Sequence, residues 1–191
     1  SHSLPAFISE FSPLKDSEIL QDKCVSVAGR IGSKRSSGAK LVFYDLTGED
    51  VKIQVMAQEQ NASSYDFEAI NSLLRRGDII GVRGFPGRTR KGELSIFPIE
   101  MILLSPCYRM LPRARYGLKD QETRYRQRHL DLIMNADTRR IFQARTRIIK
   151  YLRNFLDSRN FLEVETPMMS MIAGGASAKP FKTHHNDLNL D

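Results

Sequence analysis

Cysteine and long apolar runs are both scarce in this sequence. Cys24 and Cys107 have neither the spacing of a metal site nor that of a redox motif, so we expect small buried residues without a disulfide. The longest apolar stretches, DIIGV and MILL, are strand-sized and far shorter than the roughly 18 residues that a membrane span needs. No charged-then-apolar leader opens the chain, and we therefore expect a soluble, cytosolic protein with no bound metal.

Positive charge is what the chain has in excess. Its 191 residues are 41% hydrophobic and 27% charged, which is ordinary for a globular protein of one or two domains. The formal net charge is +7, and basic residues cluster within 75–91 and 109–128. Basic clusters favour a polyanionic partner such as nucleic acid, because each neutralised phosphate releases counterions, although many basic proteins have no such partner.

The first half of the chain has the period of β-strands. Five short β-rich runs, CVSVAGRI, KLVFYDL, VKIQVMA, GDIIGVRG and ELSIFPIEMILL, are separated by turn residues. Between the third and fourth lies DFEAINSLLRRG, whose apolar residues have helical spacing. Three strands, a helix and two strands are the order of an OB-fold barrel. LPAFISEF, before the first strand, is expected to be a short helical or irregular lead-in.

The second half has a different organisation. The segment around Pro106 and Pro112 has little periodicity and many charges, as an interdomain linker would. Farther along, Arg124, Arg126 and Arg128 either contact a partner or pair internally with Asp120, Glu122 and Asp131. From Thr138 to about Arg159, apolar residues recur every three or four positions and predict a long amphipathic helix, closed by Asn160 in a left-handed conformation. FLEVET is then expected to be a strand that ends at Pro167.

Strand parity identifies side chains on the outer face of the barrel. Val42, Tyr44 and Leu46 share the core parity, which sends Phe43 outward, and the same reasoning sends Gln54, Glu93 and Ser95 outward. An exposed aromatic, amide and carboxylate on neighbouring strands suit an OB-fold that stacks and hydrogen-bonds a base. The alternative is that Phe43 lies under the lead-in or the linker and that the two polar residues are merely solvated. Arg35, in the loop after the first strand, is a base contact or a surface charge.

Several ordered motifs resemble the lysyl-tRNA synthetases of class II, more closely those of eukaryotes than those of bacteria. They are FYDLTGEDVKIQV, RRGDIIGVRGFPGRTRKGELSI, LLSPC, MLP, GLKDQETRYRQRHLDL, FLEVETPMM and GGASAKPFKTHHNDL. The resemblance covers nearly the whole chain from about Leu4. It implies an OB-fold anticodon-binding domain over 1–110, an interdomain linker over 111–135, and over 136–191 the start of a class II α+β catalytic domain.

The resemblance also implies roles for particular residues. Phe43 would stack on an anticodon base of the lysine tRNA, and Gln54, Glu93 and Arg35 would hydrogen-bond its uridine-rich anticodon. The long helix and FLEVETP would form motif 1 of a homodimer, with Pro167 as its signature proline. Gly175 would lie against the amino group of the substrate lysine, where close backbone approach leaves no room for a side chain.

The implied reaction is ATP-dependent aminoacylation of tRNA through a lysyl-adenylate, with ATP and Mg²⁺ as cofactors of the full-length enzyme. Neither motif 2 nor motif 3 is present, so we expect no catalytic residue and no activity in these 191 residues alone. Two other hypotheses stay open: a stand-alone OB-fold module that binds RNA or single-stranded DNA, and a protein-interaction role on a multi-synthetase scaffold.

Overall fold

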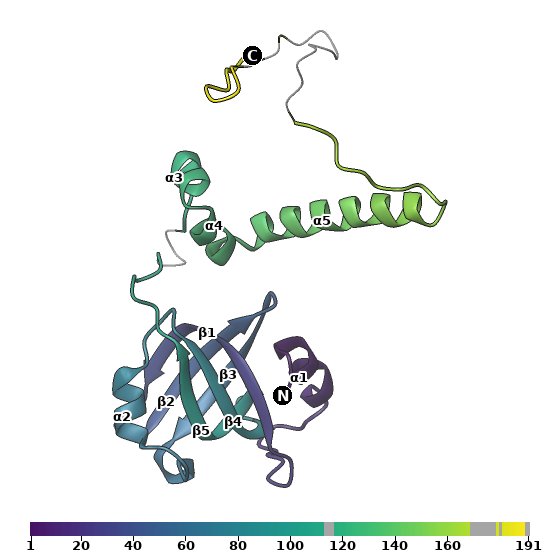
Figure 1. Ribbon diagram of the computed structural model, residues 1–191. Coiled ribbons are helices and arrows are strands. Elements are labelled where there is room, and N and C mark those ends of the chain that lie inside the picture. Colours follow the sequence, from purple (N-terminus) through teal and green to yellow (C-terminus); the bar gives the residue numbers. More distant parts are fainter. Residues whose placement is uncertain (113–116, 169–178, 180, 190–191) are drawn as a thin grey trace. The chain divides into compact units, whose positions relative to one another are not determined.

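A computed structural model gives the fold of the chain (Figure 1). It describes residues 1–112, 117–168, 179 and 181–189. The chain separates into two compact units, Ser1–Thr138 and Arg139–Asp191. The strands of the sheet all belong to the first unit.

Five strands close a barrel in the order β1-β2-β3-β5-β4, as Figure 1 shows. Their bounds are β1 (Val25–Ser36), β2 (Leu41–Gly48), β3 (Val51–Gln58), β4 (Ile79–Arg88) and β5 (Leu94–Ser105). Neighbours are antiparallel except for β3 and β5, which meet in parallel where Gln54 faces Ser95 and Val55 faces Ile96. Helix α2 (Phe67–Leu73) connects β3 to β4, with the one-turn helix η1 (Glu59–Asn61) before it. This topology confirms the predicted OB-fold barrel.

The core of the barrel follows the predicted alternation along its strands. Val42, Tyr44 and Leu46 of β2 are buried, and so are Ile53 and Val55 of β3. Burial raises the pKa of the Tyr44 hydroxyl, which stays protonated and donates to Oδ1 of Asn71 on α2.

The lead-in is a helix that contributes to this core. Helix α1 (Leu4–Phe11) begins at Ser3, whose Oγ accepts a hydrogen bond from the backbone N of Ala6 at 3.2 Å. Leu4, Phe7 and Phe11 lie on one face of the helix and are buried with the barrel residues. The helix therefore belongs to the barrel rather than preceding it as a loose segment.

A β-bulge in β1 changes which of its residues face outward. Ile31 pairs with Leu46 and Ser33 with Asp45, so one residue of β1 is extra at Gly32. Beyond the bulge, Arg35 pairs with Phe43 inside the strand. The expectation that Arg35 lies in a loop was wrong, because the first strand continues five residues past the run that its sequence pattern marked.

The predicted linker contains two short helices, α3 (Gln121–Arg126) and α4 (Arg128–Met134), held together by one buried carboxylate. Asp131 is fully buried; its Oδ1 accepts from Arg124 Nε at 2.9 Å and from Asn135 Nδ2 at 2.6 Å, and its Oδ2 accepts from Arg128. Arg126 pairs with Glu122 at 2.5 Å. Arg124, Arg126 and Arg128 thus pair internally, one of the two predicted alternatives.

The long helix that periodicity predicts is α5 (Ala136–Asp157), which begins at the end of the first unit and belongs mostly to the second. Asn160 has φ of 63° and turns the chain after it, as expected. Residues 161–168, however, have no regular secondary structure, so the predicted FLEVET strand was wrong. A strand needs a partner for its backbone groups, and among the described residues none pairs with this segment.

The two cysteines lie nearer the surface than the sequence predicted. Cys24 is exposed and Cys107 partly exposed, so their predicted burial was wrong: each flanks an end of the barrel instead of lying on its inner face. Both thiols are free.

Within the part of the chain that the structure describes, no helix combines the length and apolar character needed to cross a membrane.

Candidate nucleic-acid interface

Strand register aligns the candidate residues in two rows across the outer face of the barrel. In one row, Arg35 of β1 pairs with Phe43 of β2, which pairs with Met56 of β3. In the adjacent row, Asp45 pairs with Gln54, which faces Ser95 across the parallel contact of β3 with β5. Residues from four strands therefore meet on one patch of surface.

A groove with a volume of about 510 Å³ lies over these rows. It contains all four residues predicted to read a base, and it adds apolar and basic residues around them. The lining residues are Ser17, Ile19, Arg35, Phe43, Gln54, Met56, Gln58, Arg88, Thr89, Arg90, Lys91, Glu93 and Phe97. The groove thus combines an aromatic ring, hydrogen-bonding groups and cations, the set that single-stranded nucleic acids require.

A hydrogen-bonded chain orients the polar groups of the groove. Gln54 Nε2 donates to Glu93 Oε2 at 3.0 Å, and Ser95 Oγ donates to Gln54 Oε1 at 3.0 Å. Gln54 is only 4% exposed, so the expectation of a freely exposed amide was wrong; its amide lies between Glu93, just before β5, and the buried Ser95 of β5. One hydrogen of Nε2 and the second carboxylate oxygen of Glu93 remain as donor and acceptor for a ligand.

Phe43 and Arg35 form the other side of the groove. The guanidinium carbon of Arg35 lies 6.0 Å from the centre of the Phe43 ring, and Arg35 Nη2 lies 3.5 Å from Asp45 Oδ1. The Arg35 side chain is 60% exposed, so it reaches solvent while these two contacts limit its range. Phe43 is half-buried and faces the groove, not α1, which leaves its ring available for stacking.

Basic residues of the β4–β5 turn form one rim of the groove. Thr89 donates its backbone N–H to the carbonyl of Glu93 at 3.0 Å, which closes the turn. Arg88 supports it by donating to the carbonyl oxygens of Gly92 at 2.5 Å and Ser12 at 2.6 Å. Arg90 is exposed, and so is Lys91 beside it, so both cations can reach a phosphate.

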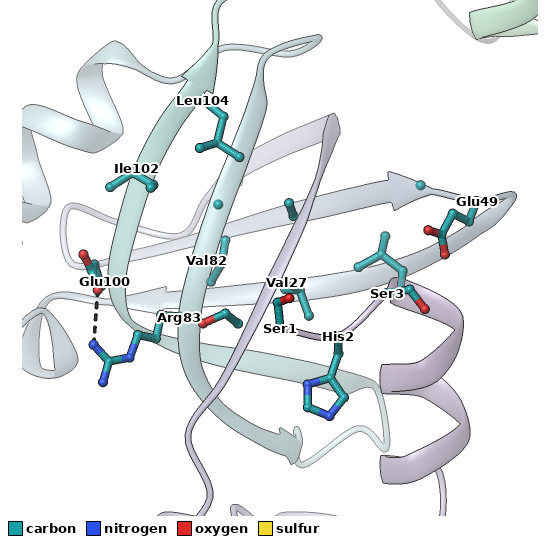
Figure 2. Close-up of a pocket in the computed structure, with 15 residues that line it drawn as sticks. Ser1, His2, Ser3, Val27, Glu49, Val82, Arg83, Glu100, Ile102 and Leu104 are labelled. Atoms are coloured by element: carbon teal, nitrogen blue, oxygen red, sulfur yellow. Dashed lines mark ion pairs between the residues drawn. The ribbon is translucent and has the colours of Figure 1, made fainter.

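A second concavity, shown in Figure 2, has a different character. Ile102 and Leu104 of β5 project there beside Val82 of β4, and they are 49% and 51% exposed. At its edge, Arg83 Nη1 and Glu100 Oε2 pair at 3.6 Å. This concavity is mainly aliphatic and its lining includes no aromatic ring apart from that of His2, so it suits base recognition less well than the groove.

Two further predicted positions belong to the C-terminal part of the chain. Pro167 is described, exposed and outside regular secondary structure, and its role in motif 1 stays a prediction. Gly175 lies outside the described residues. Among the residues that are described, no cluster of three or more His, Cys, Asp or Glu side chains is placed to hold a metal ion.

Comparison with known proteins assigns the two parts of the chain. Residues 25–104 match the OB-fold nucleic acid binding domain, and residues 120–190 match the class II tRNA synthetases of the D, K and N group. A lysine–tRNA ligase of Cladosporium cladosporioides is 53% identical over all of this chain. The chain belongs to the class II lysyl-tRNA synthetase family. The sequence resemblance is thereby confirmed.

Other lysyl-tRNA synthetases show how much of the family's length is present. A probable cytoplasmic lysine–tRNA ligase of Encephalitozoon cuniculi is 47% identical over 100% of this chain, and a lysine–tRNA ligase of Thermoanaerobacter pseudethanolicus is 47% identical over 92% of it. The chain covers 33%, 36% and 35% of these three relatives. It therefore spans about a third of the length of the lysyl-tRNA synthetases that it matches.

The sequence analysis assigned no role to some residues in or beneath the groove. Ser95 was placed on the outer face without a role, because nothing in its sequence context shows that it would be fully buried against Gln54. Ile19 lies in an irregular segment that bridges to Gly87 of β4, and an irregular segment has no periodicity to reveal it. Met56 was not named in the sequence analysis either, although it shares the parity of Gln54, and that signal could have identified it.

Proposed function

We propose that this chain provides anticodon recognition and the motif 1 dimer portion of a lysine–tRNA ligase, the enzyme that joins lysine to its tRNA through a lysyl-adenylate. One observation carries the proposal: Arg35, Phe43, Gln54 and Glu93, chosen from the sequence, line a single groove on an OB-fold barrel. The match of the chain to lysyl-tRNA synthetases also supports it.

The hydrogen-bonding pattern of the groove fits uracil. The Watson–Crick edge of uracil presents a carbonyl, an N–H and a second carbonyl, so it needs a donor, an acceptor and a donor. Gln54 Nε2 and the Arg35 guanidinium are donors, and the Glu93 carboxylate only accepts. Cytosine has a lone pair at N3, which would face the carboxylate with no proton between them. The groove should therefore prefer uracil, with Phe43 stacked against the base.

The wider activity is proposed from the family. The complete enzyme would use L-lysine, ATP and Mg²⁺ and would act as a cytoplasmic homodimer. The described residues contain no cluster fit to hold Mg²⁺, so no step of the reaction is assigned to them. Their contribution is binding and orientation of the tRNA, which raises the effective concentration of its acceptor end at a catalytic site.

Binding of an anticodon stem-loop tests the proposal. The 191-residue chain is titrated with a hairpin of anticodon UUU and with the same hairpin carrying cytosine at the middle position, at near-physiological salt. We expect a preference for UUU of about tenfold, equivalent to about 1.4 kcal/mol, and we expect Glu93→Gln to reduce it. Equal binding with a steep salt dependence would instead identify a module that binds any single strand and reject the base-reading roles.

A further inference from the structure

Ser95 occupies a position that the base-reading roles leave unexplained. Its side chain is 0% exposed, on the strand where β5 contacts β3. Gln54 and Glu93 line the groove, whereas Ser95 lies beneath them. A buried hydroxyl on the outer face of a barrel costs free energy unless hydrogen bonds satisfy it.

Two acceptors lie within reach of the single hydrogen of this hydroxyl. Ser95 Oγ lies 3.0 Å from Gln54 Oε1 and 3.1 Å from the backbone carbonyl oxygen of Glu93. It thus connects the two residues proposed to read the base. At the other end of the amide, Gln54 Nε2 donates to the carboxylate of Glu93.

The two contacts of the Gln54 amide differ in how a ligand would affect them. Glu93 is exposed, so water and the N–H of a bound base compete with Nε2 for its carboxylate. The contact with Ser95 is buried, so neither water nor a base can replace it. Only Ser95 can therefore hold the amide in the same orientation before and after binding.

We propose that Ser95 is a positioning residue that fixes the Gln54 amide with its Nε2 toward the groove, and thereby sets the preference of the groove for uracil. This inference rests on the proposed function. Without the Ser95 hydroxyl, Gln54 Oε1 would be a buried acceptor with no donor, and the amide would rotate to expose it to water in the groove. An acceptor would then stand where a uracil carbonyl needs a donor.

Side-chain order in the free protein tests the positioning itself. The ¹⁵N–¹H nuclear Overhauser effect of the Gln54 side-chain amide reports its order, and its resonances are assigned by their loss in Gln54→Glu. We expect the amide to be ordered in the wild-type chain and in Glu93→Ala, and mobile in Ser95→Ala. If Glu93→Ala frees the amide while Ser95→Ala leaves it ordered, Glu93 is the residue that holds it and the inference is overturned.

Base discrimination tests the consequence. The control is Tyr44→Phe, which also removes a buried hydroxyl that donates to a side-chain amide oxygen, but in the core. We expect Ser95→Ala to reduce the preference for UUU over the cytosine hairpin by roughly three- to tenfold, the effect of one neutral hydrogen bond, and Tyr44→Phe to leave the preference unchanged. An unchanged preference in Ser95→Ala, or an equal loss in Tyr44→Phe, would overturn the inference.

The two experiments separate the inference from the proposed function. If the wild-type chain binds both hairpins equally, the proposed function fails, and the order of the Gln54 amide still decides whether Ser95 positions it. Glu93→Ala changes an exposed residue and keeps the buried contact intact, so it remains informative even if Ser95→Ala does not fold.

Discussion

At the scale of single residues, Phe43 and its polar neighbours would contribute in different ways to the proposed recognition of a base. Every base has a π face, so stacking on Phe43 would stabilise binding of any base. Hydrogen bonds from Gln54 and Glu93 depend on the edge of the base and would differ between uracil and cytosine. Affinity and selectivity should therefore respond to different substitutions.

Phe43→Ala is expected to weaken binding of both hairpins by about 1–3 kcal/mol, the usual contribution of base stacking on an aromatic residue. The ratio of the two affinities should stay the same, because the hydrogen-bonding residues are retained. Tyr108→Ala is the control, since Tyr108 is 92% exposed and does not line the groove. The measurement is fluorescence anisotropy of labelled hairpins, and a loss confined to UUU would contradict the assignment of stacking to Phe43.

Prediction from the sequence succeeded at this scale where strands are regular. A period of two was enough to place Phe43 and Gln54 on one face, since β2 and β3 pair without interruption. It could not place Arg35, because the bulge at Gly32 reverses the parity of the residues after it. It could not foresee the burial of Gln54 either, because that burial depends on β5, a strand distant in the sequence.

At the scale of elements, the β4–β5 pair depends on close backbone contact at Gly84. A second register shift lies between Arg83 and Gly84, and a Cβ at Gly84 would lie 2.1 Å from the carbonyl oxygen of Phe97. Backbone atoms within a sheet cannot move aside as a flexible side chain can. In the sequence, a glycine at this position indicates a bulge or a close backbone approach, but it does not identify Phe97 as the neighbour.

Gly84→Ala is accordingly expected to destabilise the barrel by roughly 3 kcal/mol, at the upper end of the usual cost of overpacking. Gly32→Ala is the matched control, because a Cβ there would meet its nearest atom, Thr47 Cγ2, at an ordinary 3.4 Å. Urea denaturation monitored by circular dichroism measures both variants. Equal stability of the two variants would show that the contact with Phe97 does not constrain the sheet.

The junction of α3 and α4 depends on the charge of Asp131. Its burial acts to raise the pKa, but hydrogen bonds from Asn135 and Arg124 outweigh that effect and the pKa of Asp131 is lowered overall. A carboxyl with a lowered folded-state pKa stabilises the fold above its unfolded pKa, near 3.8, and that stabilisation disappears as the pH falls through the folded value.

We therefore expect hydrogen exchange in α3 and α4 to be slow at pH 6 and to accelerate, relative to the intrinsic rate, below about pH 4. Asp131→Ala should lose this protection at both pH values, because it leaves Arg124 and Arg128 without their shared carboxylate. We expect that variant to lose roughly 3 kcal/mol of stability. Protection that is the same at pH 6 and pH 3 would show that the charge of Asp131 does not hold the helices.

Sequence periodicity predicted the long helix, but it did not predict the structure of the segments before and after it. A 22-residue amphipathic pattern specifies α5 by itself. The segment FLEVET has the composition of a strand, but a strand also requires a partner, and composition does not supply one. Helices α3 and α4 are too short for a periodic signal, and contacts with Asp131 define them instead.

At the scale of the whole molecule, the second unit leaves a wide apolar surface uncovered. Ile148, Leu152 and Leu156 lie on one face of α5 and are 61%, 53% and 45% exposed. Exposed apolar patches of this kind mark association surfaces. The proposed motif 1 dimer would cover this face with a second copy of the chain.

Leu152→Asp is expected to shift the chain toward monomer in sedimentation velocity, because it places a charge within the apolar face. Asn154→Asp introduces the same side chain two residues away, on the opposite side of the helix, and should leave association unchanged. If the wild-type chain sediments as a monomer at all accessible concentrations, or if both variants behave alike, α5 does not mediate self-association.

The parallel contact between β3 and β5 has a consequence for the energetics of the barrel. The barrel closes where Gln54 faces Ser95 and Val55 faces Ile96, and the same two polar residues lie at or beneath the groove. A nucleotide bound by Gln54 and Glu93 would contact both sides of this closure and hold β3 and the start of β5 together. Binding of the anticodon would then raise the free energy needed to open the barrel. The folded domain would therefore be more stable with its tRNA bound than without it.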